Sequence, residues 1–176
     1  MLYVARHGQT VWNAQNKVCG ITDVNLTEKG LEQAKSLALS VKSKKIDIVI
    51  SSPLTRAVET SKIVSDMLGI PFEVDDRLIE QNYGIYEGVD RKNEEFLANK
   101  RNFAYKYPDG ESMMQVAYRI YGLVDEMKDK YEDQNVLLIS HGGVCRIINT
   151  YFHDMTNDEF FNYTLENGHL EEYGIK

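Results

Sequence analysis

Three short apolar runs, each followed at once by a polar, chemically active segment, constrain the fold of this chain most. Residues 2–5 lead into Arg6-His7-Gly8, residues 136–140 lead into His141-Gly142-Gly143, and residues 46–50 lead into the segment 51–56. Runs of this length and apolarity are typical of buried strands, and helical patterns lie between them. We therefore expect an α/β fold, a three-layer α/β/α sandwich with a mainly parallel central sheet.

Start and stop signals place the helices between these strands. Thr27 can cap a helix whose apolar face extends to Val41, and Ser52 is a suitable N-cap for a helix that starts at Pro53 and ends at Gly69. We expect two further helices, over 112–131 and 144–152, a short strand over 72–74 and an edge strand within 168–173. Residues 89–107 have weak periodicity, and we expect them to form a helix and loop over the active site.

Length and composition favour an ordinary globular domain. The 176 residues, of which 43% are hydrophobic, suit one domain over 1–176 with a sizeable core. We find no apolar stretch long enough for a membrane span and no signal-peptide pattern at the N-terminus. Two cysteines, Cys19 and Cys145, do not suggest a disulfide framework. These features predict a reduced, cytoplasmic setting. We expect the protein to be a monomer or a homodimer.

Although the chain is acidic, arginine and histidine residues gather at the ends of the predicted strands. A net charge of −7 argues against nucleic acid or a membrane as a partner. Yet Arg6, His7, Arg56 and His141 all follow strands at the same expected sheet edge, where open α/β folds bind their ligands. Arginine offers a planar fork that suits phosphate, and histidine can be a neutral nucleophile. Such a group in an acidic chain predicts an anionic ligand.

Six motifs in order resemble those of the histidine phosphatase superfamily, the phosphoglycerate-mutase-like proteins. The resemblance spans most of the chain. The matching stretches are Arg6-His7-Gly8-Gln9-Thr10-Val11-Trp12-Asn13, residues 20–30, Ser51-Ser52-Pro53-Leu54-Thr55-Arg56-Ala57, residues 80–88, Pro108-Asp109-Gly110-Glu111-Ser112 and Ser140-His141-Gly142-Gly143.

The resemblance implies a role for each site residue. His7 would be the nucleophile that forms a phosphohistidine, and Glu80 the general acid and base. His141 would bind a phosphoryl oxygen in its charged form. The residues that would bind the phosphate are Arg6, Asn13, Arg56, His141 and Gly142. We expect no metal and no cofactor, because these cations would supply the positive charge.

Two assignments rest on position alone. Glu87 is a nearby competitor for Glu80, and Glu111 a distant one. Asn13 could bind an oxygen or simply cap a turn. The residues expected to form a substrate pocket are Cys19, Gly20, Ile21, Thr22, Tyr83, Arg91 and Met113.

Three functions are compatible with these motifs: a phosphatase, a cofactor-dependent phosphoglycerate mutase, and a non-catalytic protein that binds a phosphorylated ligand. Only about twenty residues separate Gly88 from Pro108, whereas mutases that resemble this family carry a longer, basic insertion there. Gln81 stands where mutases usually have arginine, although Arg91 falls near a mutase lysine. We favour a phosphatase that acts on a small phosphate ester, such as α-ribazole phosphate, a sugar phosphate, phosphoserine or a phosphoglycerate.

Overall fold

A five-stranded sheet organises the molecule. The computed structural model describes residues 1–174. The strands are β1 (Leu2–Arg6), β2 (Ile48–Ser51), β3 (Phe72–Val74), β4 (Val136–Ser140) and β5 (Leu170–Tyr173), in the order β3-β2-β4-β1-β5. All neighbours pair in parallel except β5, which runs antiparallel to β1 at the edge. The predicted parallel sheet and edge strand are confirmed.

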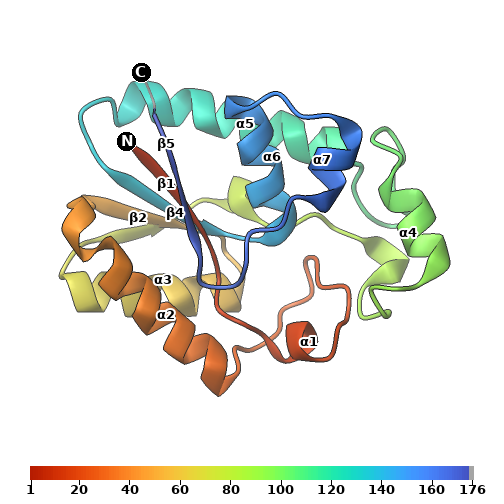
Figure 1. The fold of residues 1–176 in the computed structure, drawn as a ribbon, viewed down its shortest axis with the longest axis horizontal. Coiled ribbons are helices and arrows are strands. Elements are labelled where there is room, and N and C mark those ends of the chain that lie inside the picture. The colour runs from red at the N-terminus through yellow and green to blue at the C-terminus, as the bar shows by residue number, and fades with distance from the viewer. Residues whose placement is uncertain (175–176) are drawn as a thin grey trace.

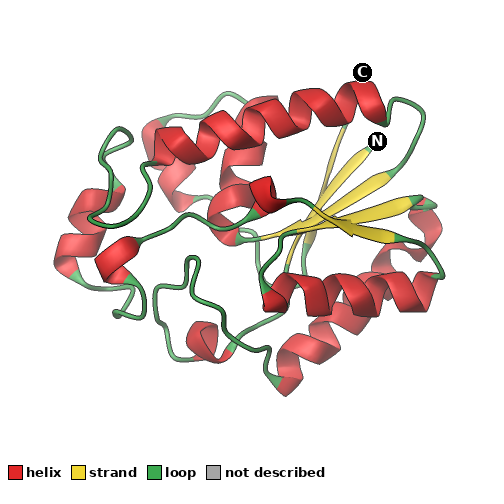
Figure 2. Cartoon of the chain, turned by 180° about the vertical axis from the view of Figure 1, so that it is seen from behind, coloured by secondary structure: helices red, strands yellow, loops and turns green. Residues whose placement is uncertain are grey.

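Helices cover both faces of the sheet, as expected. The helices α2 (Glu28–Val41) and α3 (Thr55–Leu68) pack on one face, and α5 (Met113–Lys130) and α6 (Gly142–Phe152) on the other (Figures 1 and 2). Because side chains alternate along a strand, Leu2 and Val4 of β1 point into the core under α5 and α6. Tyr3 and Ala5 point into the core under α2 and α3. The fold is therefore a three-layer α/β/α sandwich.

Most of the predicted helix signals act as expected. The Thr27 side chain accepts a hydrogen bond from the Gly30 amide at 3.1 Å, and Ser112 forms a capping box with Gln115. Gly69 ends α3 in the left-handed conformation, with φ 68°. The predicted start of α3 is wrong. The helix begins at Thr55 with Leu54 as N-cap, because the Ser52 hydroxyl lies 2.6 Å from Nε2 of His141.

Within residues 1–174 the structure also has three shorter α-helices and three 3-10 helices. The α-helices are α1 (Val11–Ala14), α4 (Glu94–Lys100) and α7 (Asn157–Asn162), and the 3-10 helices are Lys42–Lys44, Asp76–Leu78 and Gly84–Tyr86. Of the α-helices, the first two lie with their loops beyond the carboxyl ends of the strands (Figure 1). Within 89–107, α4 is the predicted helix, and its Phe96 packs with Tyr83, Tyr86 and Tyr107 in a separate aromatic cluster. This cluster anchors α4 over the end of the sheet.

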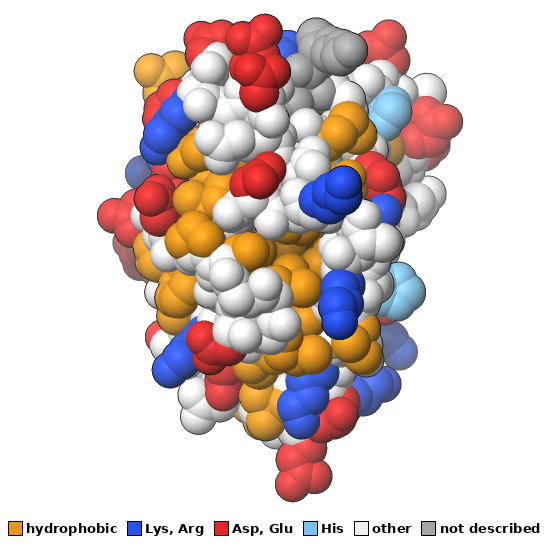
Figure 3. Space-filling view, turned by 90° about the vertical axis from the view of Figure 1, so that its left-hand side faces the viewer, with side chains coloured by type: hydrophobic (Ala, Val, Ile, Leu, Met, Phe, Trp, Pro, Cys, Tyr) orange, Lys and Arg blue, Asp and Glu red, His pale blue; other side chains and the backbone are white. Residues whose placement is uncertain are grey.

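Acidic and basic side chains are scattered over the face of the molecule opposite α4. There, side chains of both signs surround a central apolar area (Figure 3). Cys19 and Cys145 are both free thiols. In the part of the chain described, no helix combines the length and apolarity needed to cross a membrane.

Candidate active site

The carboxyl ends of β1 and β4 bring the two glycine-flanked histidines together. Arg6 pairs with Ser140 in the parallel register, and the His7 amide donates to the Ser140 carbonyl at 3.0 Å. The rings of His7 and His141 therefore lie next to each other, with their centroids 5.0 Å apart and their planes tilted by 59°. Arg56, from the first turn of α3, reaches the same point. The juxtaposition expected from the sequence is present.

His7 is held in one tautomer. Its Nδ1 lies 2.6 Å from the Gly8 carbonyl oxygen, which can only accept, so Nδ1 carries the proton. Nε2 therefore carries no proton, and its lone pair accepts a hydrogen bond from Nε of Arg56 at 3.3 Å. Burial lowers the pKa of His7 well below its ordinary value, and the charges of Arg56 and Arg6 act in the same direction. His7 is therefore a neutral imidazole with an unprotonated Nε2.

Arg56 lies fully buried behind the two histidines. Its Nε is 3.3 Å from both Nε2 of His7 and Nδ1 of His141. Its terminal nitrogens donate to the carbonyl oxygens of Thr22 and Gly20 at 2.9 and 2.6 Å. The loop that contains Gly20 and Thr22 therefore fixes the orientation of the guanidinium.

His141 is neutral in this arrangement. Burial lowers its pKa well below the ordinary value, and the charge of Arg56 lowers it further. Its Nδ1 accepts from Arg56, so Nε2 donates to the Ser52 hydroxyl at 2.6 Å. The expectation that His141 binds a phosphoryl oxygen in its charged form concerns the site with phosphate bound, and it stays a prediction.

Arg6 supplies a hydrogen-bond donor with no acceptor. Its Nη1 donates to the Leu165 carbonyl at 3.0 Å, while its Nε is buried and has no partner among residues 1–174. A buried donor left unpaired costs about 1–3 kcal/mol, so a ligand that accepts from it gains affinity. A Cβ added to Gly142 would lie 3.5 Å from the Arg6 guanidinium carbon, so Gly142 lies directly against the guanidinium.

Asn13 caps a turn, one of the two roles considered for it, and its binding of a substrate oxygen stays a prediction. Its Oδ1 accepts from the Thr10 amide at 3.1 Å, in the capping box of α1, and from Nδ2 of Asn167 at 3.3 Å. The side-chain amide nitrogen remains available where Asn13 lines the pocket. Asn167, which the sequence analysis missed, also donates to the His7 carbonyl at 2.9 Å.

Glu80 lies with its carboxylate against the start of α6. Its Oε2 accepts from the Gly143 amide at 2.9 Å, and its Oε1 accepts from the Gln81 amide at 2.9 Å. A Cβ at position 143 would come within 2.5 Å of Oε1, so this approach requires glycine. The second glycine after His141 therefore admits the carboxylate to the site, where Glu80 lines the pocket.

The two competing glutamates are engaged elsewhere. Glu87 accepts from four backbone amides, those of Gly20, Ile21, Thr22 and Tyr83, at 3.0 to 3.3 Å. Its carboxylate therefore holds the loop that orients Arg56.

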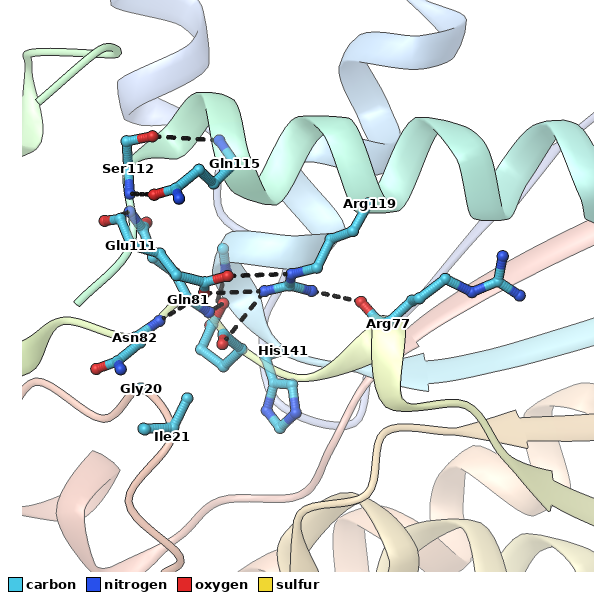
Figure 4. A network of polar contacts seen from close by, with 12 residues as sticks. Gly20, Ile21, Arg77, Gln81, Asn82, Glu111, Ser112, Gln115, Arg119 and His141 are labelled. Atoms are coloured by element: carbon cyan, nitrogen blue, oxygen red, sulfur yellow. Dashed lines mark hydrogen bonds and ion pairs between the residues drawn. The ribbon is translucent and has the colours of Figure 1, made fainter. Parts of the chain in front are cut away.

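Glu111 belongs to a second network, which Figure 4 shows. It accepts from the Asn82 amide at 3.0 Å and from Arg119 at 3.3 Å. Arg119 also donates to the carbonyls of Arg77 and Glu80. This network fixes the backbone that carries Glu80, and of the three glutamates Glu80 is the one that lines the pocket together with His7.

A pocket of about 160 Å³, partly open to solvent, lies at this edge of the sheet. It is lined by Arg6, His7, Asn13, Val18, Cys19, Glu80, Tyr83, Arg91, Phe96, Lys100, Gly142, Gly143, Arg146, Tyr163, Thr164 and Leu165. Of the expected substrate-pocket residues, Cys19, Tyr83 and Arg91 are therefore in place.

Four of the expected pocket residues lie elsewhere. Gly20, Ile21 and Thr22 are not part of the lining, because their backbone groups face Arg56 and Glu87. Met113 was wrongly expected there. As the first residue of α5 it is buried in the core on that face of the sheet, and it borders a different cavity.

Two basic residues of the lining were missed by the sequence analysis. Arg146 lies one helical turn beyond Gly142 on α6, so the helical period could have indicated it. Lys100 lies at the end of α4 on the same face as Phe96, four residues earlier, and carries no such signal. Among residues 1–174, no cluster of three or more His, Cys, Asp or Glu side chains could hold a metal ion.

Comparisons with a family model and with individual known proteins point to the same family. Residues 2–176 match the model of the histidine phosphatase superfamily (branch 1). A Hydrogenobacter thermophilus protein named "Putative phosphoserine phosphatase 2" is 33% identical over 97% of this chain and 87% of its own. A Yersinia pestis protein named "Probable phosphoglycerate mutase GpmB" is 34% identical over 80% of this chain and 69% of its own.

The fold agrees with that of solved phosphatases. The structure of a mycobacterial glucosyl-3-phosphoglycerate phosphatase, in complex with VO3, superposes with a TM-score of 0.87 at 26% identity. The match covers 96% of this chain and 88% of that protein.

Proposed function

The chain belongs to the histidine phosphatase superfamily, and from this premise we propose that it hydrolyses a small phosphate monoester through a phosphohistidine at His7. The observation that carries the proposal is the state of His7, a neutral imidazole in the pocket lining whose Nε2 carries no proton and accepts a 3.3 Å hydrogen bond from Arg56. The unpartnered Nε of Arg6 in the same pocket supports it, because a phosphoryl oxygen would satisfy this donor.

The reaction takes two displacements. In the first, Nε2 of His7 attacks phosphorus as the ester P–O bond breaks, and the acid form of Glu80 gives its proton to the leaving oxygen. In the second, Glu80 takes a proton from water, which attacks phosphorus, and the N–P bond breaks to release phosphate. One carboxylate serves both steps because its role reverses between them.

Charge stabilisation comes from the cations around His7. Arg6 and the first residues of α6 line the pocket beside His7, and Arg56 lies against Nε2 of His7, so their positive charge would stabilise the charge that gathers on the phosphoryl oxygens. A phosphate dianion would also raise the pKa of His141, since it adds the negative charge that this site otherwise lacks. We infer that these groups make a metal ion unnecessary.

The names of the relatives supply candidate substrates. They include a phosphoserine phosphatase, a phosphoglycerate mutase and a glucosyl-3-phosphoglycerate phosphatase. All three names refer to esters of a small, hydroxyl-bearing acid. The aromatic and basic lining of the pocket suits a leaving group of that size and polarity.

A panel of phosphorylated metabolites tests the proposal. Released phosphate and isomerised ester should be measured in the same reactions, since a mutase returns the phosphoryl group to the organic product. We expect stoichiometric release of phosphate, and inhibition by vanadate, which mimics five-coordinate phosphorus. Isomerisation without net phosphate release would establish the mutase, and binding without turnover of any ester would establish a non-catalytic protein.

A further inference from the structure

The outer half of the pocket contains three basic side chains that the two displacements do not use. Arg91 comes from the loop after Glu87, Lys100 from the end of α4, and Arg146 from the second turn of α6. Segments far apart in the sequence thus direct positive charge into one space. A chain of net charge −7 gathers these groups here against a single lining carboxylate, that of Glu80.

None of the three has an acidic partner. Within residues 1–174, no carboxylate forms an ion pair with Arg91, Lys100 or Arg146. Arg91 uses its Nε on the Lys17 carbonyl at 3.0 Å, and Arg146 uses Nε and Nη2 on the Tyr163 carbonyl. These backbone bonds orient the two guanidiniums without neutralising them.

The cations are close enough to repel one another. Burial, followed by the charges of Arg146 and Arg91, lowers the pKa of Lys100 to about 8. Arg91 also lowers the pKa of Arg6, after the effect of burial. Unpaired like charges in a partly dry pocket are unfavourable, and an anion bound among them would relieve the repulsion.

We propose that Arg91, Lys100 and Arg146 form a second anion subsite, which binds a carboxylate or further phosphate on the leaving group of the substrate. The proposal rests on the proposed function, since the scissile phosphoryl group is taken to lie at His7. It defines the substrate class as a phosphate monoester with two anionic groups. A neutral sugar or alcohol phosphate would leave the subsite unfilled.

Matched pairs of esters test the subsite directly. The carboxylate pair is 3-phosphoglycerate and glycerol 3-phosphate, which differ by a carboxylate in place of a hydroxymethyl group. The phosphate pair is 1,3-propanediol bisphosphate and 3-hydroxypropyl phosphate. We expect kcat/KM to favour the doubly anionic member of at least one pair by about tenfold to a hundredfold, the effect of one or two charged hydrogen bonds. The pair with the larger ratio identifies the anion.

Variants at Lys100 separate a local site from a general charge effect. Lys100→Gln should remove most of the preference by lowering kcat/KM for the doubly anionic ester. The kcat/KM of the ester whose leaving group is uncharged should change little. Lys100→Arg should retain the preference. Lys92→Gln, on an exposed lysine outside the pocket lining, is the matched control and should behave as the wild type.

Three kinetic results would overturn the subsite: a wild-type ratio near one in both pairs, an equal loss of both members in Lys100→Gln, or an equal effect of Lys92→Gln. If no ester is hydrolysed, the proposed function fails instead. Calorimetric titration with the same pairs then decides the subsite, which requires tighter binding of a doubly anionic member and loss of that difference in Lys100→Gln.

Discussion

The reactive form of His7 depends on neighbours that no sequence motif records. The carbonyl of Gly8 keeps the proton on Nδ1, and burial together with Arg56 and Arg6 keeps the ring neutral. The place of His7 after the first strand was sufficient to predict its position at the edge of the sheet beside His141. Its tautomer could not be predicted, because that depends on the backbone geometry of the next residue.

The lowered pKa of His7 has a consequence for the pH profile. A group that must be neutral to attack, and whose pKa lies well below 6.5, stays active to a correspondingly lower pH. We expect the acid limb of kcat/KM, which reports the free enzyme, to lie below pH 6.5. The profile should be measured with correction for the ionisation of the ester itself. An acid limb at or above the ordinary imidazole value would contradict the account.

Glu80 should matter most for poor leaving groups. An alkyl alkoxide needs a proton in order to leave, whereas the stabilised phenolate of p-nitrophenyl phosphate needs it far less. Glu80→Gln should therefore slow phosphoenzyme formation from alkyl esters by about a hundredfold or more, and from aryl esters much less. Rapid quench isolates that step from water attack. An equal loss for both ester types would assign the acid to another residue.

At the level of loops and helices, Glu87 holds the segment that orients Arg56. Its two carboxylate oxygens each accept two backbone amides, and two carbonyls of the same loop receive the guanidinium. From the sequence, Glu87 was an alternative to Glu80 for the general acid and nothing more. Its structural role could not be predicted, because it depends on a contact between segments more than sixty residues apart.

Glu87→Gln should impair activity through Arg56. An amide can accept on one oxygen only, so two amides of the loop would face an NH2 group. We expect the free energy of unfolding to fall by about 1–3 kcal/mol. We also expect kcat/KM to fall by about tenfold or more, because small displacements at a site are costly. Thermal unfolding and steady-state kinetics measure these effects, with the exposed Glu132→Gln as control. Unchanged kinetics would show that the loop does not orient Arg56.

Periodicity predicted the elements well where local signals decide them. The caps at Thr27 and Ser112 and the strands β3 and β4 lie where expected. The errors arise where tertiary contacts override local preference. Ser52 is a good N-cap by type, yet its hydroxyl is engaged by His141 from another strand, so the helix starts later.

On the scale of the whole molecule, an acidic chain can bind phosphate because its basic side chains gather in the pocket. The chain has net charge −7, but its pocket is lined by Arg6, Arg91, Lys100 and Arg146 and by one carboxylate. The sequence indicated the phosphate end of this pocket through the strand termini. It did not reveal Lys100, because the packing of α4 against the end of the sheet brings this residue to the pocket. Arg146 was missed although it lies one helical turn beyond Gly142 on α6.

This concentration of positive charge leads to a prediction about metals. The arginines and the positive end of α6 supply what divalent cations supply to many other phosphatases. Dialysis against a strong chelator should therefore leave the rate of ester hydrolysis unchanged. Loss of activity that magnesium or zinc restores would show that the cations of the pocket are not sufficient.

Trapping of the phosphoenzyme tests the central claim most directly. Wild-type protein, His7→Ala and the exposed-site control His153→Ala should each be mixed briefly with a substrate labelled in its phosphoryl group and then denatured. The account predicts acid-labile, base-stable label on His7 in the wild type and in His153→Ala. It predicts neither label nor turnover in His7→Ala. Label on a different residue, or near-normal turnover in His7→Ala, would contradict it.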